Sequence, residues 1–591
     1  MLLSYKCQKK PKNCMSENQD NVALFILKAL KQEGIDHIFL VPGGMIDPFL
    51  PNYSKADIQA VVAAHEGGAA YMADGYARAR QSFGVCMGIG GPGVTNMVTA
   101  ISAAYADRSP VLVVSGMIPP TWEGDGAFQD SSASSIDDHE IMRPITVWAE
   151  CIPAVEKVGD FLQKAIRTMR GIENRPAFIT VPLDMQSENY TESYQPLKLE
   201  EPARIIDTIA VQKVPEILAG ATRIGIYAGN GCVWSKADKA IREFAEKFSI
   251  PVVTTLRAKG AISEEHPMSL GVFGLGGSLQ ANKMVMGSQK PIITKAEPII
   301  TKAEVLLVLG ATLNENNTHS WASGFPPSNS LVRVDINQNS VVGKSYQETF
   351  IVGDVREFLS WLRDNEDQFA AALRASQPER QAWIEAIRKT PYYDTEADRK
   401  SDLVPMHPAR VIAELRKATP NDTVIVADSG AHTFFTGHNW TSYAPNECLI
   451  LTTTGPMGYG VAVGIGAKMA RPTQPCVSVV GDGSMLMHGM EIQTAVRYNV
   501  PLVIVVINNS ALGNVYLRAV REGPEAAKLA ELPKHNWAAF AHSLGGDGMV
   551  VKHPDQLAEA FERALASKVP FVVDTWCSRD CTTPNTDKPG A

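Results

Sequence analysis

A carboxylate between two glycines, followed further along the chain by a pair of amides, suggests a metal-assisted anion site. Asp482 lies in Gly481-Asp482-Gly483-Ser484, directly after a short β-branched run that is typical of a buried parallel strand. Asn508-Asn509 follows a second such run. Magnesium prefers oxygen ligands and takes few of them from protein carboxylates. We predict that Asp482, the amide oxygen of Asn509 and the backbone carbonyl of Ala511 hold this ion.

The glycine-rich turn itself suits a phosphate. A turn from strand to helix presents backbone N–H groups and the positive end of the helix to an anion, and we expect a helix over residues 489–498. The Ser484 hydroxyl either bonds a phosphate or caps its helix. A lone Gly-Asp-Gly is usually a plain turn, and a nicotinamide-binding turn requires a G-x-G-x-x-G spacing that this segment lacks. The joint occurrence of the two motifs at strand ends favours the metal and phosphate site.

A second carboxylate lies far away in the sequence. Glu66 follows His65 and precedes the small residues Gly67-Gly68-Ala69-Ala70, which indicate the start of a helix. Taken alone, Glu66 is best interpreted as an N-terminal carboxylate that interacts favourably with the helix dipole. A catalytic function becomes the better interpretation only alongside the other motifs.

Together with further segments in the same order, these motifs resemble the thiamine diphosphate (ThDP)-dependent enzymes of the acetolactate synthase and pyruvate oxidase group. The resemblance covers nearly all of the chain after about Asn21. Each segment alone is weakly specific, whereas their order and spacing are highly specific. The further segments are Val41-Pro42-Gly43-Gly44, Gly75-Tyr76-Ala77-Arg78, Gly91-Pro92-Gly93-Val94-Thr95-Asn96, Ala127-Phe128-Gln129, Asp428-Ser429-Gly430-Ala431-His432 and Gly455-Pro456-Met457-Gly458.

The resemblance implies functions for particular residues. Glu66 would hydrogen-bond a pyrimidine nitrogen of ThDP and favour the imino tautomer, whose exocyclic nitrogen takes the C2 proton. Met457 would wedge between the two coenzyme rings, although core filling is the commoner use of methionine. Gln129 would donate to a reacting oxygen, unless it is an exposed loop amide. The implied active-site residues are Glu66, Gly44, Phe128 and Gln129, and the implied coenzyme-binding residues are Pro42, Asn96, His432, Gly455, Met457, Asp482, Gly483, Ser484, Asn509, Leu512 and Gly513.

The chain departs from the acetolactate synthase pattern at several positions. Gly67 replaces a glutamine after the catalytic glutamate, and residues 314–317 replace a segment where a flavin-using relative carries arginine. FAD is therefore doubtful, and we expect flavin to be loosely bound or dispensable. Arg518 occupies, by counting, the position of a tryptophan in the acceptor pocket. Its guanidinium would bind a carboxylate, phosphate or sulfonate of one reactant, or it pairs with Glu522 on a helix surface.

The resemblance implies a ThDP- and Mg²⁺-dependent carboligase that decarboxylates a 2-oxo acid and transfers the acyl unit to an acceptor, as acetolactate synthase does. A non-ligating decarboxylase or oxidase is the alternative among enzymes, although the paired histidines of simple pyruvate decarboxylases are missing. A catalytically silent regulatory relative is disfavoured, because Glu66, Asp482 and Asn509 are intact. In the family, two subunits contribute to one site, which implies a homodimer or homotetramer with shared active sites.

Composition excludes several classes. The net charge of −8 over 591 residues argues against a general binder of nucleic acid or anionic membranes. No apolar run approaches the roughly 18–20 residues of a membrane span. Nine cysteines without metal-ligand spacing indicate reduced thiols and a cytoplasmic location. Cys577 and Cys581 are expected to be free rather than paired.

Alternating helix-like and strand-like runs predict an α/β fold with three doubly wound parallel-sheet domains. We expect a disordered tail at 1–20, a pyrimidine-binding domain at 21–185, a central domain at 205–364 and a diphosphate-binding domain at 403–580. Residues 291–297 are repeated directly at 298–304, and the first copy is interpreted as an inserted loop. The expected strands are 85–89, 111–114, 177–181, 224–228, 251–255, 305–309, 331–335, 423–427, 476–480, 501–507 and 571–574.

Overall fold

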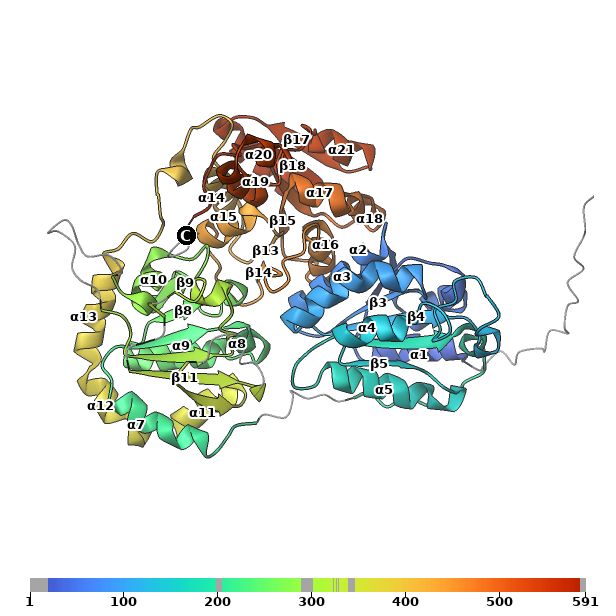
Figure 1. Cartoon of the computed structure of the whole chain (residues 1–591), viewed down its shortest axis with the longest axis horizontal. Coiled ribbons are helices and arrows are strands. Elements are labelled where there is room, and N and C mark those ends of the chain that lie inside the picture. Colours follow the sequence, from blue (N-terminus) through green and yellow to red (C-terminus); the bar gives the residue numbers. More distant parts are fainter. Residues whose placement is uncertain are drawn as a thin grey trace, which may run out of the picture.

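The computed structural model describes residues 20–197, 205–288, 301–322, 324–325, 327, 329–338 and 346–584. Three α/β domains follow one another along the chain, and each is built on a parallel sheet of six strands. Figure 1 shows the first domain in blue and teal, the central domain in green and yellow, and the third in orange and red above the other two. The predicted fold class of three parallel-sheet α/β domains is confirmed.

The first sheet has the strand order β2-β1-β3-β4-β6-β5. Its interior strands β4 and β6 are buried along their whole length, because helices cover both faces of a parallel sheet. The strands are β1 (His37–Leu40), β2 (Gln59–Val62), β3 (Gly84–Ile89), β4 (Val111–Met117), β5 (Trp148–Cys151) and β6 (Ala177–Pro182). The helices are α1 (Val22–Gln32), α2 (Glu66–Arg80), α3 (Pro92–Asp107), α4 (Asp138–Met142), α5 (Val158–Met169) and α6 (Leu183–Gln186).

The central sheet has the order β12-β11-β10-β7-β8-β9. Two further helices, α12 (Ala370–Ala375) and α13 (Gln377–Arg388), lead from it toward the third domain. The strands are β7 (Ile224–Ala228), β8 (Val252–Thr254), β9 (Ser269–Val272), β10 (Val305–Leu309), β11 (Ser330–Asp335) and β12 (Glu348–Val352). The helices are α7 (Val214–Ala219), α8 (Asn230–Trp234), α9 (Asp238–Phe248), α10 (Leu279–Met286) and α11 (Val355–Asp364).

The third sheet has the order β14-β13-β15-β16-β18-β17, so that β15 and β16 lie side by side at its centre. The strands are β13 (Val424–Ala427), β14 (Cys448–Leu449), β15 (Cys476–Gly481), β16 (Val503–Asn508), β17 (Asp547–Val551) and β18 (Phe571–Trp576). The helices are α14 (Pro408–Ala418), α15 (Ala431–Asn439), α16 (Gly460–Ala470), α17 (Asp482–His488), α18 (Ile492–Arg497), α19 (Gly513–Glu522), α20 (Pro524–Lys528), α21 (Trp537–Ser543) and α22 (Leu557–Ala566).

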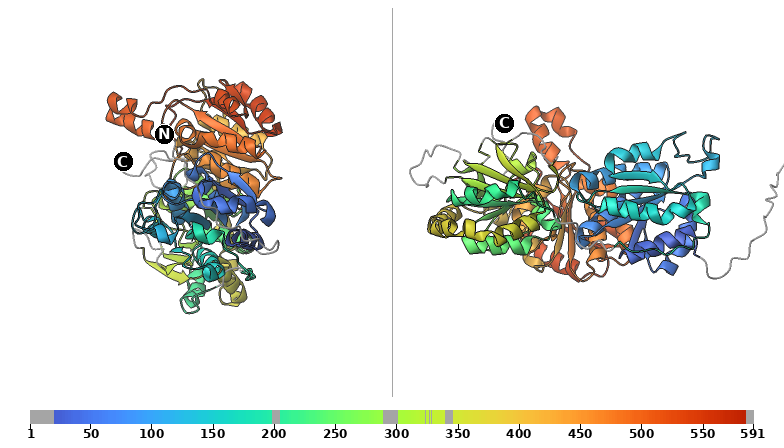
Figure 2. Two further views of the ribbon diagram at one scale, coloured as in Figure 1. Left: turned by 90° about the vertical axis from the view of Figure 1, so that its right-hand side faces the viewer. Right: turned by 90° about the horizontal axis from the view of Figure 1, so that it is seen from below.

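Helices α2 and α16 join the first and third domains. A Cβ at Gly75 would lie 2.3 Å from the carbonyl oxygen of Val463, and one at Gly466 would lie 1.9 Å from that of Met72. Only glycine permits such a close approach of two helix backbones. The packing places Glu66, the first residue of α2, beside the third domain. Figure 2 shows the first and central domains on opposite sides of the third.

The helix expected over residues 489–498 begins earlier in the structure. Helix α17 starts at Asp482 itself, and a 3₁₀ turn at Gly489–Glu491 separates it from α18. The cause lies at Gly481, which is the last residue of β15 and also the N-cap of α17. The strand therefore passes into the helix without a connecting turn, and Asp482 occupies the first helical position.

Several other expectations concern the chain outside the sheets. The tail at 1–19 and the repeat over residues 291–300 lie outside the described residues. All seven cysteines in the described part of the chain are free, including Cys577 and Cys581, as predicted. Among the helices of the described residues, none is both long and apolar enough to cross a membrane.

Candidate active site

A cavity of about 230 Å³ lies at the carboxyl end of the third sheet. Ligands of parallel α/β sheets bind outside this end of the strands. The residues after β13, β15 and β16, with the segment before α16, form its wall. The structure thereby brings together nine of the predicted coenzyme-binding residues, namely His432, Gly455, Met457, Asp482, Gly483, Ser484, Asn509, Leu512 and Gly513.

The Asp482 carboxylate is buried and is held by three donors. Its Oδ2 accepts hydrogen bonds from the backbone N–H groups of Asn509 (2.8 Å) and Ser510 (2.9 Å). Its Oδ1 accepts a third from Nε1 of Trp537 (2.8 Å). Burial raises the pKa of Asp482, and the three hydrogen bonds act in the opposite direction. The carboxylate orientation is thus fixed before any ligand binds.

The three predicted metal ligands all line this cavity. Asn509 and Ala511 follow β16, and Oδ1 of Asn509 accepts a hydrogen bond from the backbone N–H of Ala511 (3.2 Å). In the described part of the chain, no group of three or more His, Cys, Asp or Glu side chains is arranged to hold a metal ion. The donors gathered here are instead one carboxylate, one amide and one carbonyl. Such hard oxygen atoms fit magnesium, with phosphate and water completing its shell.

Two features of the wall fit a phosphate. Nε2 of His432 is buried and has no hydrogen-bond partner among the described residues. Burial lowers the pKa of His432 to about 4, so that its ring is neutral at pH 7 and one nitrogen carries a proton to donate. Gly483 lies close to two side chains, because a Cβ there would meet Cδ2 of Leu512 at 2.5 Å and Cε of Met457 at 2.6 Å. A side chain at Gly483 would therefore displace Leu512 and Met457, both of which line the cavity.

Asp428 holds the segment that carries Gly455 and Met457. It is fully buried, and its two oxygens accept hydrogen bonds from the backbone N–H groups of Gly458 (2.9 Å) and Gly460 (2.6 Å). Burial raises its pKa to about 6. Asp428 belongs to a sequence motif, but its function could not be inferred from the sequence, because Gly458 and Gly460 lie 30 residues away or more.

Glu66 lies at the carboxyl end of the first sheet. Its Oε2 accepts a hydrogen bond from Nδ2 of Asn96 (2.9 Å), so two of the predicted residues are in contact. Glu491 of the third domain holds the segment directly before α2. Its carboxylate accepts hydrogen bonds from the backbone N–H groups of Ala64 (3.1 Å) and His65 (3.2 Å). The function of Glu491, a buried acid, could not be inferred from the sequence, because its contacts with Ala64 and His65 form only through the fold.

The other predicted residues of the first domain lie apart from the cavity. Within the described residues, its lining comes entirely from residues 429–518, and Glu66, Pro42, Gly44 and Asn96 are not part of it. Phe128 is 83% exposed on the loop before α4. Gln129 beside it has a positive φ of 59°. The structure therefore brings together the predicted residues of the third domain, but it does not bring the predicted residues of the first domain to the same cavity.

Arg518 does line the cavity, together with Asn514 and Val515 from the same helix, α19. The alternative prediction, an ion pair with Glu522, is not formed in the part of the chain that the structure describes. No hydrogen bond from the Arg518 guanidinium to another described residue occurs either. The side chain is a cation at the wall of the cavity, available to a ligand.

A second cavity of about 100 Å³ lies at the carboxyl end of the central sheet. Its wall includes Arg108 and Arg257, and each of them already faces a carboxylate. Arg108 lies 3.4 Å from Asp335, and Arg257 lies 3.1 Å from Asp107. Asn317, from the segment where a flavin-using relative carries arginine, also belongs to this wall.

The protein has three parallel-sheet domains, and the third carries a glycine-rich cavity lined by oxygen atoms. These features are typical of a cofactor-dependent α/β enzyme. Comparison with known families identifies the cofactor. The N-terminal TPP binding domain of thiamine pyrophosphate enzymes matches residues 20–138, the central domain matches 211–362, and the C-terminal TPP binding domain matches 428–575. The chain belongs to the thiamine pyrophosphate enzymes, in the group of acetolactate synthase and pyruvate oxidase.

Individual relatives match the chain over nearly its full length. A probable acetolactate synthase large subunit of Methanocaldococcus jannaschii is 30% identical over 566 residues, which cover 93% of this chain and 90% of the relative. The acetolactate synthase isozyme 3 large subunit of Escherichia coli is 27% identical, with coverage of 93% and 94%. The putative thiamine pyrophosphate-containing protein YdaP of Bacillus subtilis is 28% identical, with coverage of 92% and 89%.

Proposed function

We propose that this protein is a ThDP- and Mg²⁺-dependent carboligase, which decarboxylates a 2-oxo acid and transfers the acyl unit to an acceptor. The observation that carries the proposal is the cavity of the third domain, where Asp482, Asn509 and Ala511 supply oxygen donors beside the buried, unpartnered nitrogen of His432. Relatives named acetolactate synthase large subunit support the carboligase reaction.

Each residue has a defined task in this proposal. Asp482, Asn509 and Ala511 hold magnesium, and His432 with the N-terminal turn of α17 binds the diphosphate. Bound ThDP supplies the nucleophilic carbon and the electron sink for decarboxylation. Met457 would pack against the bound coenzyme, and Glu66 would hold a proton at the pyrimidine nitrogen. Gly44, Phe128 and Gln129 would border the bound substrate, and Gln129 would donate a hydrogen bond to its oxygen.

Product analysis tests the reaction class. Purified protein with ThDP and MgCl₂ is incubated with a panel of 2-oxo acids, each alone and with a second 2-oxo acid or an aldehyde. A carboligase gives CO₂ and a longer hydroxy-ketone. An aldehyde as the only product indicates the decarboxylase, and oxidised acid with consumption of O₂ indicates the oxidase. Absence of CO₂ release from every donor contradicts the enzyme proposal and favours the silent relative.

We expect the active site to be shared between two subunits of a homodimer or homotetramer. Support comes from the exposure of Phe128 and of three apolar side chains on α17 and the turn after it, Leu486, Met487 and Met490, which are 52%, 52% and 58% exposed. Clusters of exposed apolar side chains mark association sites. Two copies related by a twofold axis would form two equal sites. A cytoplasmic location is part of the same proposal and rests on the free cysteines.

Mixing two inactive variants tests the shared site. Glu66→Gln impairs the first-domain half and Asp482→Ala the third-domain half. In a mixed dimer, one site receives both substitutions and the other receives neither. We expect co-expressed variants to recover about a quarter of wild-type activity, because random assembly gives half mixed dimers with one intact site each. Activity at the level of the separate variants would show instead that each chain builds its own site.

The position of Arg518 predicts that one reactant carries a second anionic group. Charge-assisted hydrogen bonds contribute roughly 1.5–3 kcal/mol, so we expect Arg518→Leu to lower kcat/KM for the anionic reactant by about 10- to 100-fold. For reactants without the second anionic group, kcat/KM should change less than about threefold. Arg521→Leu is the matched control, since it removes the same charge from the same helix outside the cavity wall. Equal effects on both reactant types would exclude the binding function.

We expect flavin to be dispensable. The two arginines at the wall of the central cavity already face carboxylates, which leaves less positive charge for a dinucleotide diphosphate. The visible absorption spectrum of the purified protein before and after denaturation measures bound flavin directly. Stoichiometric release of flavin, together with loss of activity in the stripped protein and recovery on its return, would contradict this expectation.

A further inference from the structure

The Asp482 carboxylate has little capacity left for a metal ion. An ionised carboxylate offers about four positions, roughly two on each oxygen, at which it accepts hydrogen bonds or binds a metal. The backbone N–H groups of Asn509 and Ser510 occupy both positions on Oδ2, and Nε1 of Trp537 occupies one on Oδ1. The second position on Oδ1 is left for the metal. Asp482 can therefore form a single bond to a metal ion without giving up a hydrogen bond.

Trp537 is the only side chain among these three donors, and its own position is fixed. It is 3% exposed and is the first residue of α21. Its backbone N–H donates to Oδ2 of Asp574 on β18 (2.9 Å). The ring of Phe540 packs edge-on against the indole, with 5.8 Å between the ring centroids. The indole N–H is therefore held toward Oδ1 of Asp482 by contacts that do not involve a ligand.

The buried acid Asp574 also holds the strand end that carries the second predicted metal ligand. Its Oδ1 accepts a hydrogen bond from Nδ2 of Asn508 (2.7 Å), the residue before Asn509. Nδ2 of Asn508 donates as well to the carbonyl oxygen of His535 (3.1 Å), two residues before Trp537. One carboxylate thus fixes the Trp537 indole and the backbone at Asn509 relative to each other.

A carboxylate held in this way suits one cation better than another. Magnesium requires nearly ideal octahedral geometry, with oxygen atoms at about 2.0–2.1 Å. Calcium accepts about six to eight oxygen atoms in flexible arrangements, and it can take both oxygens of one carboxylate. Asp482 offers one bond in one direction, because Oδ2 is already occupied by two backbone N–H groups. The geometry favours magnesium.

We infer that Trp537 is a positioning residue that makes the third-domain cavity select magnesium over calcium, through its hydrogen bond to Asp482. The inference rests on the proposed function in placing the metal ion and ThDP in this cavity. Without the indole N–H, both positions on Oδ1 are free and the carboxylate loses the donor that fixes this side of it. Magnesium loses more affinity from this freedom than calcium does, because magnesium has the stricter geometry.

Calorimetry without turnover tests the selectivity. The Kd of ThDP is measured at one fixed concentration of MgCl₂ and, separately, of CaCl₂, and the ratio of the calcium Kd to the magnesium Kd is compared between variants. We expect Trp537→Phe to raise the Kd about 3- to 10-fold with magnesium and less than about twofold with calcium. The ratio then falls at least about twofold. The retained calcium value shows at the same time that the variant is folded.

A tryptophan analogue separates the hydrogen bond from the packing. 3-Benzothienylalanine at position 537 has the shape of tryptophan but carries sulfur in place of the N–H group, so that it cannot donate to Asp482. We expect it to lower the ratio as Trp537→Phe does. Phe540→Leu is the converse control, because it changes the packing around Trp537 and retains the donor. It should keep the wild-type ratio.

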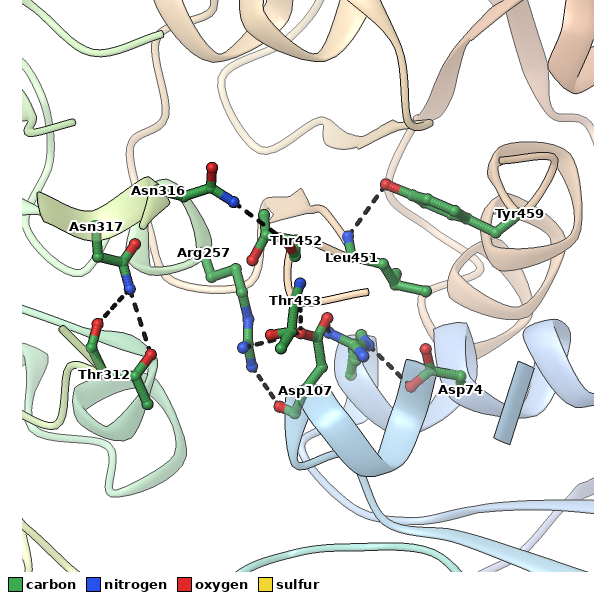
Figure 3. Close-up of polar contacts among 11 residues, drawn as sticks. Asp74, Asp107, Arg257, Thr312, Asn316, Asn317, Leu451, Thr452, Thr453 and Tyr459 are labelled. Atoms are coloured by element: carbon green, nitrogen blue, oxygen red, sulfur yellow. Dashed lines mark hydrogen bonds and ion pairs between the residues drawn. The ribbon is translucent and has the colours of Figure 1, made fainter. Parts of the chain in front are cut away.

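Thr453→Val is the matched control elsewhere in the third domain. Figure 3 shows Thr453 beside Asp107, a buried carboxylate of the first domain whose Oδ1 accepts a hydrogen bond from Oγ1 of Thr453 (2.5 Å). This variant also removes one donor from a buried carboxylate, and it does so two residues before Gly455, which lines the cavity. Among the described residues that line the cavity, neither Thr453 nor Asp107 is found. We expect ThDP affinity to change equally with the two metals.

Three results would overturn the inference. They are an unchanged ratio in Trp537→Phe, an unchanged ratio with 3-benzothienylalanine, and a fall of the ratio in Thr453→Val as large as that in Trp537→Phe. Failure of the proposed function is distinct, since it appears as a wild-type protein that binds no ThDP with either metal, and the inference would fall with it.

Discussion

Asp482→Ala is expected to abolish ThDP binding and, with it, all activity. Asp482 is the one acidic residue in the wall of the third-domain cavity within the described residues. Without Asp482, magnesium would retain only an amide and a carbonyl ligand from the protein. Neither ligand carries a negative charge to balance the charge of the ion. Loss of even an outer contact of a metal site costs 10- to 100-fold in metal affinity, so we expect the Kd of ThDP to rise by at least about 100-fold. Titration of the apoprotein with ThDP at fixed MgCl₂ measures it.

The control must separate the missing metal ligand from the missing hydrogen-bond acceptor. Without the carboxylate, Nε1 of Trp537 and the N–H groups of Asn509 and Ser510 lose their acceptor. A buried donor left unpaired costs about 1–3 kcal/mol of stability. Trp537→Phe removes one of these donors while retaining Asp482, and we expect it to weaken ThDP less than about 10-fold. Asp482→Ala protein that folds, as judged by urea unfolding, and binds ThDP within twofold of wild type would refute the assignment.

Most interior strands of the three sheets could be predicted from the sequence because they are buried on both faces, although β1 (His37–Leu40), which lies between β2 and β3, was not among the expected strands. Strands such as Val305–Leu309 and Ala177–Pro182 are continuous apolar runs, and the predicted ranges match them within one residue. Edge strands carry no such signal. Strand β17 is half-exposed over most of Asp547–Val551, and β14 has two residues. These strands form because a neighbouring strand offers hydrogen-bonding groups, which the local sequence does not reveal.

The residues of the candidate site also fall into those that could be predicted from the sequence and those that could not. Asp482 and Asn509 could be predicted because each follows a buried strand, and adjacent parallel strands bring them together. Trp537 could not, since its indole reaches Asp482 from a helix 55 residues further along the chain. Asp428 and Glu491 were missed for a related reason. The carboxylate of each residue accepts hydrogen bonds from backbone N–H groups of a distant segment. These segments come together only once the fold has formed.

A site shared between two chains would account for the way the cavity of one chain gathers only the predicted residues of the third domain. The first-domain residues Glu66 and Asn96 contact each other at the end of their own sheet, and Phe128 on the same domain is largely exposed. Aromatic residues are enriched in protein–protein interfaces. We expect the twofold-related chain to bring this surface to the cavity.

Glu66→Gln is expected to keep ThDP binding and to lose nearly all turnover. The amide fills the same volume and can still contact Asn96, but it cannot take up and return a proton at the pyrimidine nitrogen. A positioned acid or base contributes typically 10²- to 10⁴-fold, so we expect kcat to fall by about this factor while the Kd of ThDP changes less than about fivefold. Exchange of the coenzyme C2 proton for deuterium, followed by NMR after acid quench, measures the affected step directly.

Asn96→Ala is the control, because it removes the hydrogen bond to Glu66 but leaves the carboxylate. We expect this variant to lower kcat by about 10-fold or less. Exchange at the wild-type rate in Glu66→Gln would show that Glu66 has no catalytic function. Its carboxylate would then have only the structural function of interacting with the dipole of α2 at the start of the helix.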